Sequence, residues 1–296
     1  PVSAMGVPAA YTLGHEIVGR VIATGEEVSE VAPGDLRLVY PWIGCGSCAD
    51  CAQGQDNACA QPRTIGVRRP GGFADRLLVP DPRYLFDISG LDPAMAATYA
   101  CAGLTVYSAL AKLQPLSPEA PLLLIGAGGL GMSALAILKA QGHRNILVIE
   151  ARPEARADAL AAGARLAFDP EDPDLPQRLA DEAGGPLKSV INLVNSPQTA
   201  TLALSLLARG GTLVMVGLQG GAISLPLGSL PVRGQRIIGQ YTGTPAELGK
   251  LLDLARKGAL PSIPLTCRPA ERVTEALQDL RAGRVRGRLV LTRDHH

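Results

Sequence analysis

The fold class can be read from one short segment, Pro121-Leu-Leu-Leu-Ile125-Gly126-Ala-Gly128-Gly129-Leu130-Gly131. Its first five residues have the length and apolar character of a buried strand, and its glycines open a helical stretch over 132–141. Gly126 suits a tight turn, Gly128 the close approach of a pyrophosphate, and Gly131 close packing of helix on strand. The segment predicts a dinucleotide-binding turn at a helix N-terminus, although a glycine turn without a ligand fits the same residues.

The residues downstream continue the alternation of strand and helix. Strands are predicted over 145–149, 189–194 and 212–216, and helices over 153–162 and 199–208. Strands and helices that alternate at this rhythm are typical of a doubly wound parallel sheet. The sequence therefore predicts an α/β fold.

Glu150 is the residue from which we predict the choice of cofactor. It lies nineteen residues after Gly131, at the end of the second strand, where a carboxylate can bind both hydroxyls of the adenosine ribose. The same carboxylate repels a 2′-phosphate, which favours NAD over NADP. Arg152, two residues later, makes this preference for NAD less strong. The alternative interpretation is that Glu150 is a solvated side chain that binds no ligand.

Four of the six cysteines lie close together, at Cys45, Cys48, Cys51 and Cys59. In a long chain without a secretion signal, such cysteines bind metal more often than they form disulfides. Four thiolates close a tetrahedral zinc site and leave no position open for a substrate. We therefore predict a structural zinc in a loop over about 44–60, with a disulfide pair or four buried thiols as alternatives.

Composition and charge limit the partners of the protein. The 296 residues include 28 Lys and Arg against 27 Asp and Glu, which excludes nucleic-acid or membrane-surface binding by bulk charge. No apolar run approaches the roughly 20 residues of a membrane span. No signal-type hydrophobic stretch is present. We expect a cytoplasmic protein that binds neither nucleic acid nor membrane.

Four motifs stand in order along the chain: Gly14-His15-Glu16, the four cysteines, Cys101-Ala-Gly-Leu-Thr105-Val-Tyr107 and the glycine turn. Together they resemble the zinc-dependent medium-chain alcohol dehydrogenases, over essentially the whole chain. The resemblance implies a GroES-like, β-rich catalytic domain from residues 1–102 and 242–296. It also implies a Rossmann NAD-binding domain from residues 103–241, with the active site in the cleft between the two.

The resemblance implies a second, catalytic zinc. His15 and Cys101 match its histidine and cysteine ligands, and Glu16 matches a carboxylate close to the metal. Without the resemblance, His15 and Glu16 would be read as a surface or core pair, and Cys101 as a small buried residue.

The first ligand of the family's catalytic zinc is not found in this sequence. It is a Cys roughly twenty residues before the histidine, whereas fourteen residues precede His15 and none is Cys. We expect about fifty further residues before Pro1 in the natural protein, which would then bind two zinc ions. True loss of the ligand is the alternative.

The resemblance also implies further contacts to NAD. Thr105 matches a residue beside the nicotinamide, and Val216, Gly217 and Leu218 match backbone contacts to its carboxamide. Arg288 matches an arginine that reaches the pyrophosphate, although an exposed arginine on a strand fits the same position.

The function that follows is zinc-dependent transfer of a hydride between a primary or secondary alcohol and NAD, with the aldehyde or ketone as product. One alternative is a non-catalytic NAD-binding relative, supported by the absent ligand. The other is an NADP-dependent enone or quinone reductase, against which the four cysteines and Cys101 weigh. The resemblance also implies that Trp42 lies near a family position that can wall the substrate pocket, although it could equally be a packing residue.

A late segment bears on assembly. The alternating Ile223-Ser-Leu-Pro-Leu227 predicts an edge strand, for which Pro226 is suited. In the family such an edge pairs with that of a second copy, so we expect a homodimer or homotetramer. Capping of the edge within one chain is the alternative.

Overall fold

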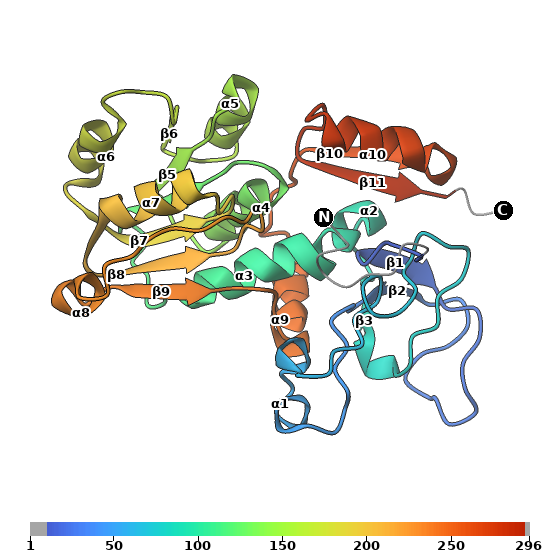
Figure 1. Ribbon diagram of the computed structural model, residues 1–296. Helices are drawn as coiled ribbons and strands as arrows, with labels where there is room; N and C mark the ends of the chain where they lie inside the picture. Colours follow the sequence, from blue (N-terminus) through green and yellow to red (C-terminus); the bar gives the residue numbers. More distant parts are fainter. Residues whose placement is uncertain (1–10, 294–296) are drawn as a thin grey trace.

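The computed structural model describes residues 11–293, whose strands form three sheets (Figure 1). A six-stranded sheet with its helices forms one lobe, here called the parallel-sheet lobe. A three-stranded and a two-stranded sheet lie together on the other side and form the small-sheet lobe. The outer ends of the predicted catalytic domain, 1–10 and 294–296, lie outside the described residues. None of the helices within 11–293 has the length and apolarity needed to cross a membrane.

The six-stranded sheet is parallel throughout, with the strand order β6-β5-β4-β7-β8-β9. The strand order reverses between β4 and β7, and ligands of doubly wound sheets bind at the carboxyl ends of the strands at such a point. The predicted α/β fold is confirmed. The strands are β4 (Leu122–Ile125), β5 (Ile146–Ile149), β6 (Leu166–Phe168), β7 (Leu187–Asn192), β8 (Leu207–Met215) and β9 (Arg236–Gly239).

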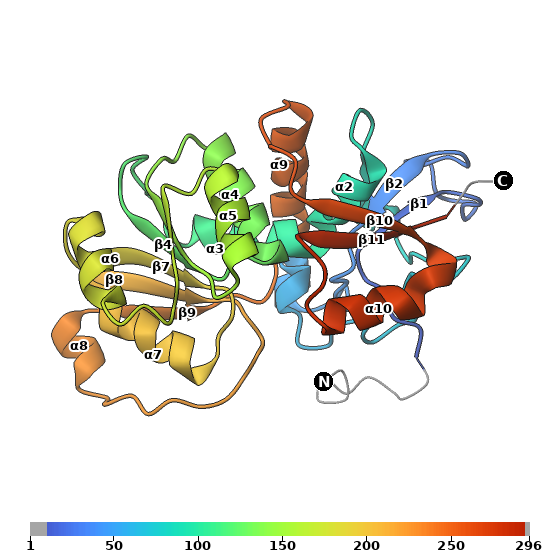
Figure 2. The same ribbon diagram turned by 90° about the horizontal axis from the view of Figure 1, so that it is seen from above.

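Helices cover both faces of this sheet (Figure 2). Leu122 and Leu124 of β4 pack toward α3, α4 and α5, whereas Leu123 and Ile125 pack toward α6 and α7. Successive side chains of a strand point to opposite faces, so an apolar run is buried on both sides. The helices are α3 (Leu104–Ala111), α4 (Gly129–Ala140), α5 (Pro153–Ala161), α6 (Leu175–Ala183), α7 (Pro197–Leu206) and the short α8 (Ser229–Arg233).

The small-sheet lobe contains segments from both ends of the chain. β1, β2 and β3 form an antiparallel sheet, and β10 pairs in parallel with β11. α2 contacts both β1 and β11 and so joins the early and late segments. These elements are β1 (Ile17–Arg20), β2 (Leu36–Val39), β3 (Leu85–Asp87), α1 (Ala49–Ala52), α2 (Pro93–Ala97), β10 (Leu265–Pro269), α10 (Val273–Arg281) and β11 (Arg288–Thr292).

Helix α9 (Pro245–Arg256) connects the two lobes. Its Leu248 and Leu252 belong to the core around β2, and Leu251 belongs to the core around α4. The helix begins with a capping box, in which Thr244 Oγ1 accepts from the N–H of Glu247 at 3.2 Å and Glu247 Oε2 accepts from the N–H of Thr244 at 2.8 Å.

Several predicted segments differ from the structure, among them the strands expected over 189–194 and 212–216, which extend over Leu187–Asn192 and Leu207–Met215. The helix expected over 132–141 already begins at Gly129, and the helix expected over 199–208 ends at Leu206, where β8 follows. The edge strand expected over 223–227 is wrong for the single chain, because these residues adopt no regular structure. A strand needs a neighbour that accepts its hydrogen bonds, and β9 already occupies this edge of the sheet.

Candidate active site and cysteine loop

His15 and Cys101 lie where the two lobes meet. His15 stands just before β1, and Cys101 lies on a π-helical turn, Tyr99–Gly103, which leads into α3. Burial lowers the pKa of His15 and therefore favours the neutral imidazole that binds metals. Burial also raises the pKa of Cys101 to about 12, against a smaller opposing effect of a hydrogen bond with Thr105.

Glu16 and Arg288 form an ion pair beside these two residues. Glu16 Oε1 also accepts from the N–H of Ala102 at 3.1 Å, so its carboxylate joins the start of β1 to the turn that carries Cys101. Arg288 comes from β11, and its Cδ lies 2.6 Å from the position that a Cβ on Gly129 would occupy. The guanidinium therefore links the predicted zinc ligands to the first turn of α4.

The donor set for a catalytic zinc is partial. His15 and Cys101 are suitable ligands, whereas the Glu16 carboxylate is engaged by Arg288 and Ala102. Within residues 11–293, the four cysteines are the one group of three or more His, Cys, Asp or Glu side chains whose ligand atoms converge. Residues 1–10 contain none of these residue types.

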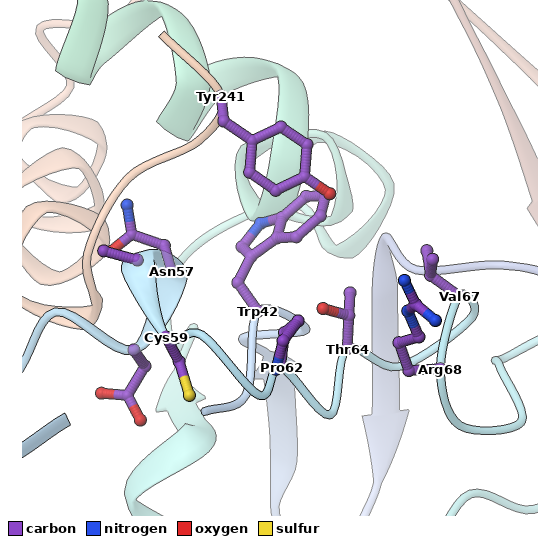
Figure 3. A pocket seen from close by; sticks show the side chains of 10 residues that line it. Trp42, Asn57, Cys59, Pro62, Thr64, Val67, Arg68 and Tyr241 are labelled. Atoms are coloured by element: carbon purple, nitrogen blue, oxygen red, sulfur yellow. The ribbon is translucent and has the colours of Figure 1, made fainter. Parts of the chain in front are cut away.

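A cavity of about 250 Å³ opens beside Trp42 and Tyr241 (Figure 3). Trp42 lines it, with its ring centroid 5.3 Å from that of His15 and 5.2 Å from that of Tyr241. The Trp42 indole donates to Ala100 O at 3.0 Å, which fixes the ring. Arg68 and Tyr241, which also line the cavity, were missed by sequence reasoning, because neither belongs to a motif.

The glycine turn has the geometry that its sequence predicts. Gly126 has a φ of +105°, and a Cβ on Gly131 would lie 2.2 Å from Gly126 O, so both positions require glycine. A Cβ on Gly128 would meet nothing within 4 Å, which leaves the backbone open to a phosphate. The first N–H groups of α4, including those of Gly129 and Leu130, have no acceptor within the helix. This turn fits the pyrophosphate of NAD.

The other predicted cofactor residues lie at the same edge of the sheet. Glu150 follows β5 and accepts from the N–H of Ala127 at 2.8 Å and from that of Arg152 at 3.0 Å. Val216, Gly217 and Leu218 follow β8 directly, and Leu218 is 78% exposed. Thr105 is buried, and its hydroxyl donates to Tyr241 O at 3.4 Å. The structure brings these residues together, and their roles stay predictions.

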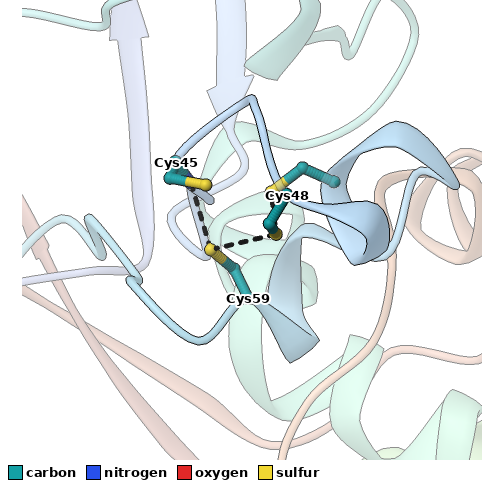
Figure 4. A group of neighbouring side chains, drawn as sticks. Cys45, Cys48 and Cys59 are labelled. Carbon is teal, nitrogen blue, oxygen red and sulfur yellow. Dashed lines mark hydrogen bonds between the residues drawn. The ribbon is translucent and has the colours of Figure 1, made fainter.

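The cysteine loop has the geometry of a zinc site (Figure 4). The four sulfur atoms all lie within 4.8 Å of one another, with Cys48 Sγ 3.5 Å from Cys51 Sγ and 3.8 Å from Cys59 Sγ. These distances are too long for a disulfide and close to the separation of about 3.8 Å between sulfurs around tetrahedral zinc. All four cysteines are free.

The surroundings of the four sulfurs differ. Hydrogen bonds stabilise the thiolate of Cys45, whereas burial of Cys51 disfavours its thiolate unless a cation is bound nearby. Cys59 Sγ accepts from the N–H of Cys45 at 3.2 Å and from that of Gln61 at 3.3 Å. Hydrogen bonds from Ser47 lower the pKa of Cys45 to about 6, whereas burial raises the pKa of Cys51 to about 12. Zinc binds cysteine in the ionised form, so the cation compensates for the desolvation of Cys51.

Comparisons with known proteins agree with this geometry. A family model described as an alcohol dehydrogenase GroES-like domain matches residues 2–89, and one described as a zinc-binding dehydrogenase matches residues 129–257. The NAD-dependent alcohol dehydrogenase of Sulfurisphaera tokodaii is 34% identical over 97% of this chain and 83% of its own length. The crystal structure of the alcohol dehydrogenase of Aeropyrum pernix is similar, with a TM-score of 0.90, 27% identity, and coverage of 98% of this chain and 85% of that one.

Proposed function

The chain belongs to the zinc-dependent medium-chain alcohol dehydrogenase family, and from this premise we propose that it transfers a hydride between an alcohol and NAD. The substrate is a primary or secondary alcohol, and the products are an aldehyde or ketone and NADH. One observation carries the proposal: Arg288 pairs with Glu16 beside His15 and Cys101 and at the same time packs against Gly129 of the glycine turn. The predicted metal ligands and the predicted cofactor-binding turn are therefore both next to Arg288.

The chain's own residues hold the cofactor in this proposal. The N–H groups at the start of α4 and the Arg288 guanidinium bind the pyrophosphate. Glu150 accepts hydrogen bonds from the ribose hydroxyls. In the structure, Glu150 Oε1 accepts a weak hydrogen bond from Arg152 Nε at 3.3 Å, and the ribose would replace this contact. Thr105 and the segment 216–218 hold the nicotinamide.

The substrate end is formed by a second set of residues. His15 and Cys101 would hold zinc, which when bound acts as a Lewis acid on the alcohol oxygen. Trp42 is 5% exposed and keeps water from one side of the site, which strengthens electrostatic interactions there. Glu16 keeps the Cys101 turn in place through Ala102.

The partial donor set favours a second candidate, an NAD-binding relative without catalytic zinc. The two candidates differ in metal content and in turnover, and both are measured on one sample. Assembly into a homodimer or homotetramer and a cytoplasmic location stay predictions.

The test measures NAD reduction over a panel of primary and secondary alcohols, with zinc counted in the same sample. It uses the natural full-length protein. We expect two zinc ions per chain and turnover that Cys101→Ser abolishes while NAD still binds. A sample that holds two zinc ions and oxidises no alcohol contradicts the proposal.

A further inference from the structure

Arg68 gives the cavity beside Trp42 and Tyr241 a positive charge. Its side chain lines the cavity opposite Asn57 (Figure 3), and no carboxylate within residues 11–293 forms a salt bridge with it. The other charged residue of the lining, Asp56, is already engaged: its Oδ1 accepts from Tyr84 OH at 2.6 Å and from Arg83 at 3.1 Å. Cys59 of the cysteine loop also lines the cavity, on the side of Asn57, whereas the guanidinium lies on the other side, near Val67 (Figure 3).

The backbone fixes Arg68 relative to the proposed reaction site. Thr64 O accepts from the N–H of Arg68 at 2.8 Å and from that of Arg69 at 3.0 Å, which closes a tight turn. Within this turn Gly66 has a φ of +76°, and a Cβ there would lie 2.6 Å from Gly14 O and 3.2 Å from His15 Cβ. The turn that carries Arg68 thus rests directly on the backbone beside His15.

Tyr241 connects the two ends of the cavity. Partial burial raises the pKa of its hydroxyl, the Cys101 thiol raises this pKa further, and the Arg68 guanidinium lowers it. The ring centroid of Tyr241 lies 5.2 Å from that of Trp42, and both residues line the cavity together with Arg68. A ligand that reaches from His15 past Trp42 and Tyr241 would meet the guanidinium.

On the basis of the proposed function, we propose that Arg68 selects alcohols that carry a carboxylate at the end remote from the reacting hydroxyl. A guanidinium binds a carboxylate through two parallel hydrogen bonds, which fixes orientation as well as position. In the reaction the alcohol carbon gives a hydride to NAD and the hydroxyl proton goes to solvent. The carboxylate keeps its charge and serves for recognition only.

Trp42 provides a readout that does not depend on turnover. It is the single tryptophan of the chain and lines the cavity, so its fluorescence reports ligand binding there. The probes are 4-hydroxybutanoate and 1,4-butanediol, which have the same carbon chain and differ in charge. We expect zinc-loaded protein to bind the hydroxy acid about tenfold more tightly, the effect of one partly solvated charge-assisted contact.

Variants assign this preference to Arg68. Arg68→Gln should reduce the preference to less than about twofold without changing diol binding, and Arg68→Lys should restore part of it because the charge remains. Arg63→Gln is the matched control, since Arg63 is exposed like Arg68 but lies outside the cavity lining, and it should behave like the wild type. Equal weakening of both probes in Arg68→Gln, or an unchanged preference, would overturn the proposal.

The kinetic experiment separates this inference from the proposed function. NAD reduction with both probes should show the same Arg68-dependent preference in kcat/KM. Turnover of alcohols without any such preference contradicts the role of Arg68 and supports the proposed function. Arg68-dependent binding of the hydroxy acid, in a protein with two zinc ions and no turnover, supports the role of Arg68 in recognition and contradicts the proposed function.

Discussion

Cys48 is a residue at which structural and catalytic roles can be separated. Its sulfur contacts those of Cys51 and Cys59, and the cysteine loop provides no open ligand position. Cys48→Ser should lower the free energy of unfolding by about 2 kcal/mol or more, because folding loses metal-binding free energy. Thermal unfolding and a zinc count measure this effect. Cys267→Ser is the control, since Cys267 is exposed and outside the loop, and a zinc-depleted Cys48→Ser protein of full stability would contradict the assignment.

Glu150 should determine the preference for NAD. Its side chain stands at the end of β5, held by the N–H groups of Ala127 and Arg152. Glu150→Ala removes the acceptor for the ribose hydroxyls and the repulsion of a 2′-phosphate. We expect NAD to bind about tenfold more weakly and the preference for NAD over NADP to become smaller. Glu154→Ala, at an exposed position of α5, should leave both cofactors unaffected. Equal wild-type kcat/KM values for the two cofactors would disprove this role.

At the scale of elements, α9 is a helix whose cap affects both lobes. Thr244→Ala removes the side-chain acceptor for the N–H of Glu247 and should cost about 1 kcal/mol of stability. Because Leu248 and Leu251 pack in different cores, both lobes should lose stability together in chemical denaturation. Thr274→Ala, at an exposed position of α10, should change stability by less than about 0.5 kcal/mol. Loss confined to one lobe would show that α9 does not couple them.

A helix or strand could be predicted from the sequence where its local pattern is compatible with only one type of secondary structure. β4 and β5 are short apolar runs between turns, and their burial on both faces agrees with the prediction. β6 and β9 were not predicted, because β6 has three residues and β9 begins with an exposed Arg236. The alternation over 223–227 forms no strand within the single chain, because pairing depends on a neighbouring strand, and its pairing with a second copy stays a prediction.

The same distinction holds for the site. The cysteines and the glycines lie in compact motifs whose chemistry restricts the residue type, so the sequence indicated them, whereas His15 was indicated by the resemblance to the family. The cavity is different, because Trp42, Arg68 and Tyr241 come from three separate segments. Only the fold brings them together, and an isolated arginine in a sequence with 28 basic residues carries no signal.

Considered as a whole, the molecule joins its lobes around the proposed site. Glu16 of the small-sheet lobe pairs with Arg288 of β11, which packs against the first turn of α4. Arg286 pairs with Asp158 of α5, so the late segments contact the parallel-sheet lobe at a second place. The cofactor turn is complete within its own lobe, whereas the proposed metal ligands come from several segments. Metal binding and NAD binding should therefore be separable.

The metal content of the 296-residue chain tests this separation. The four cysteines converge within 4.8 Å and should hold one zinc tightly. His15 and Cys101 form a partial set, and zinc sites gain affinity from three or four protein ligands, so this site should bind zinc weakly. We expect one tightly held zinc, detectable NAD binding and little or no alcohol oxidation by the chain alone. Cys101→Ser should leave that zinc in place, whereas Cys48→Ser should remove it. Robust turnover by the 296-residue chain with two bound zinc ions would show that the ligand set has been misassigned.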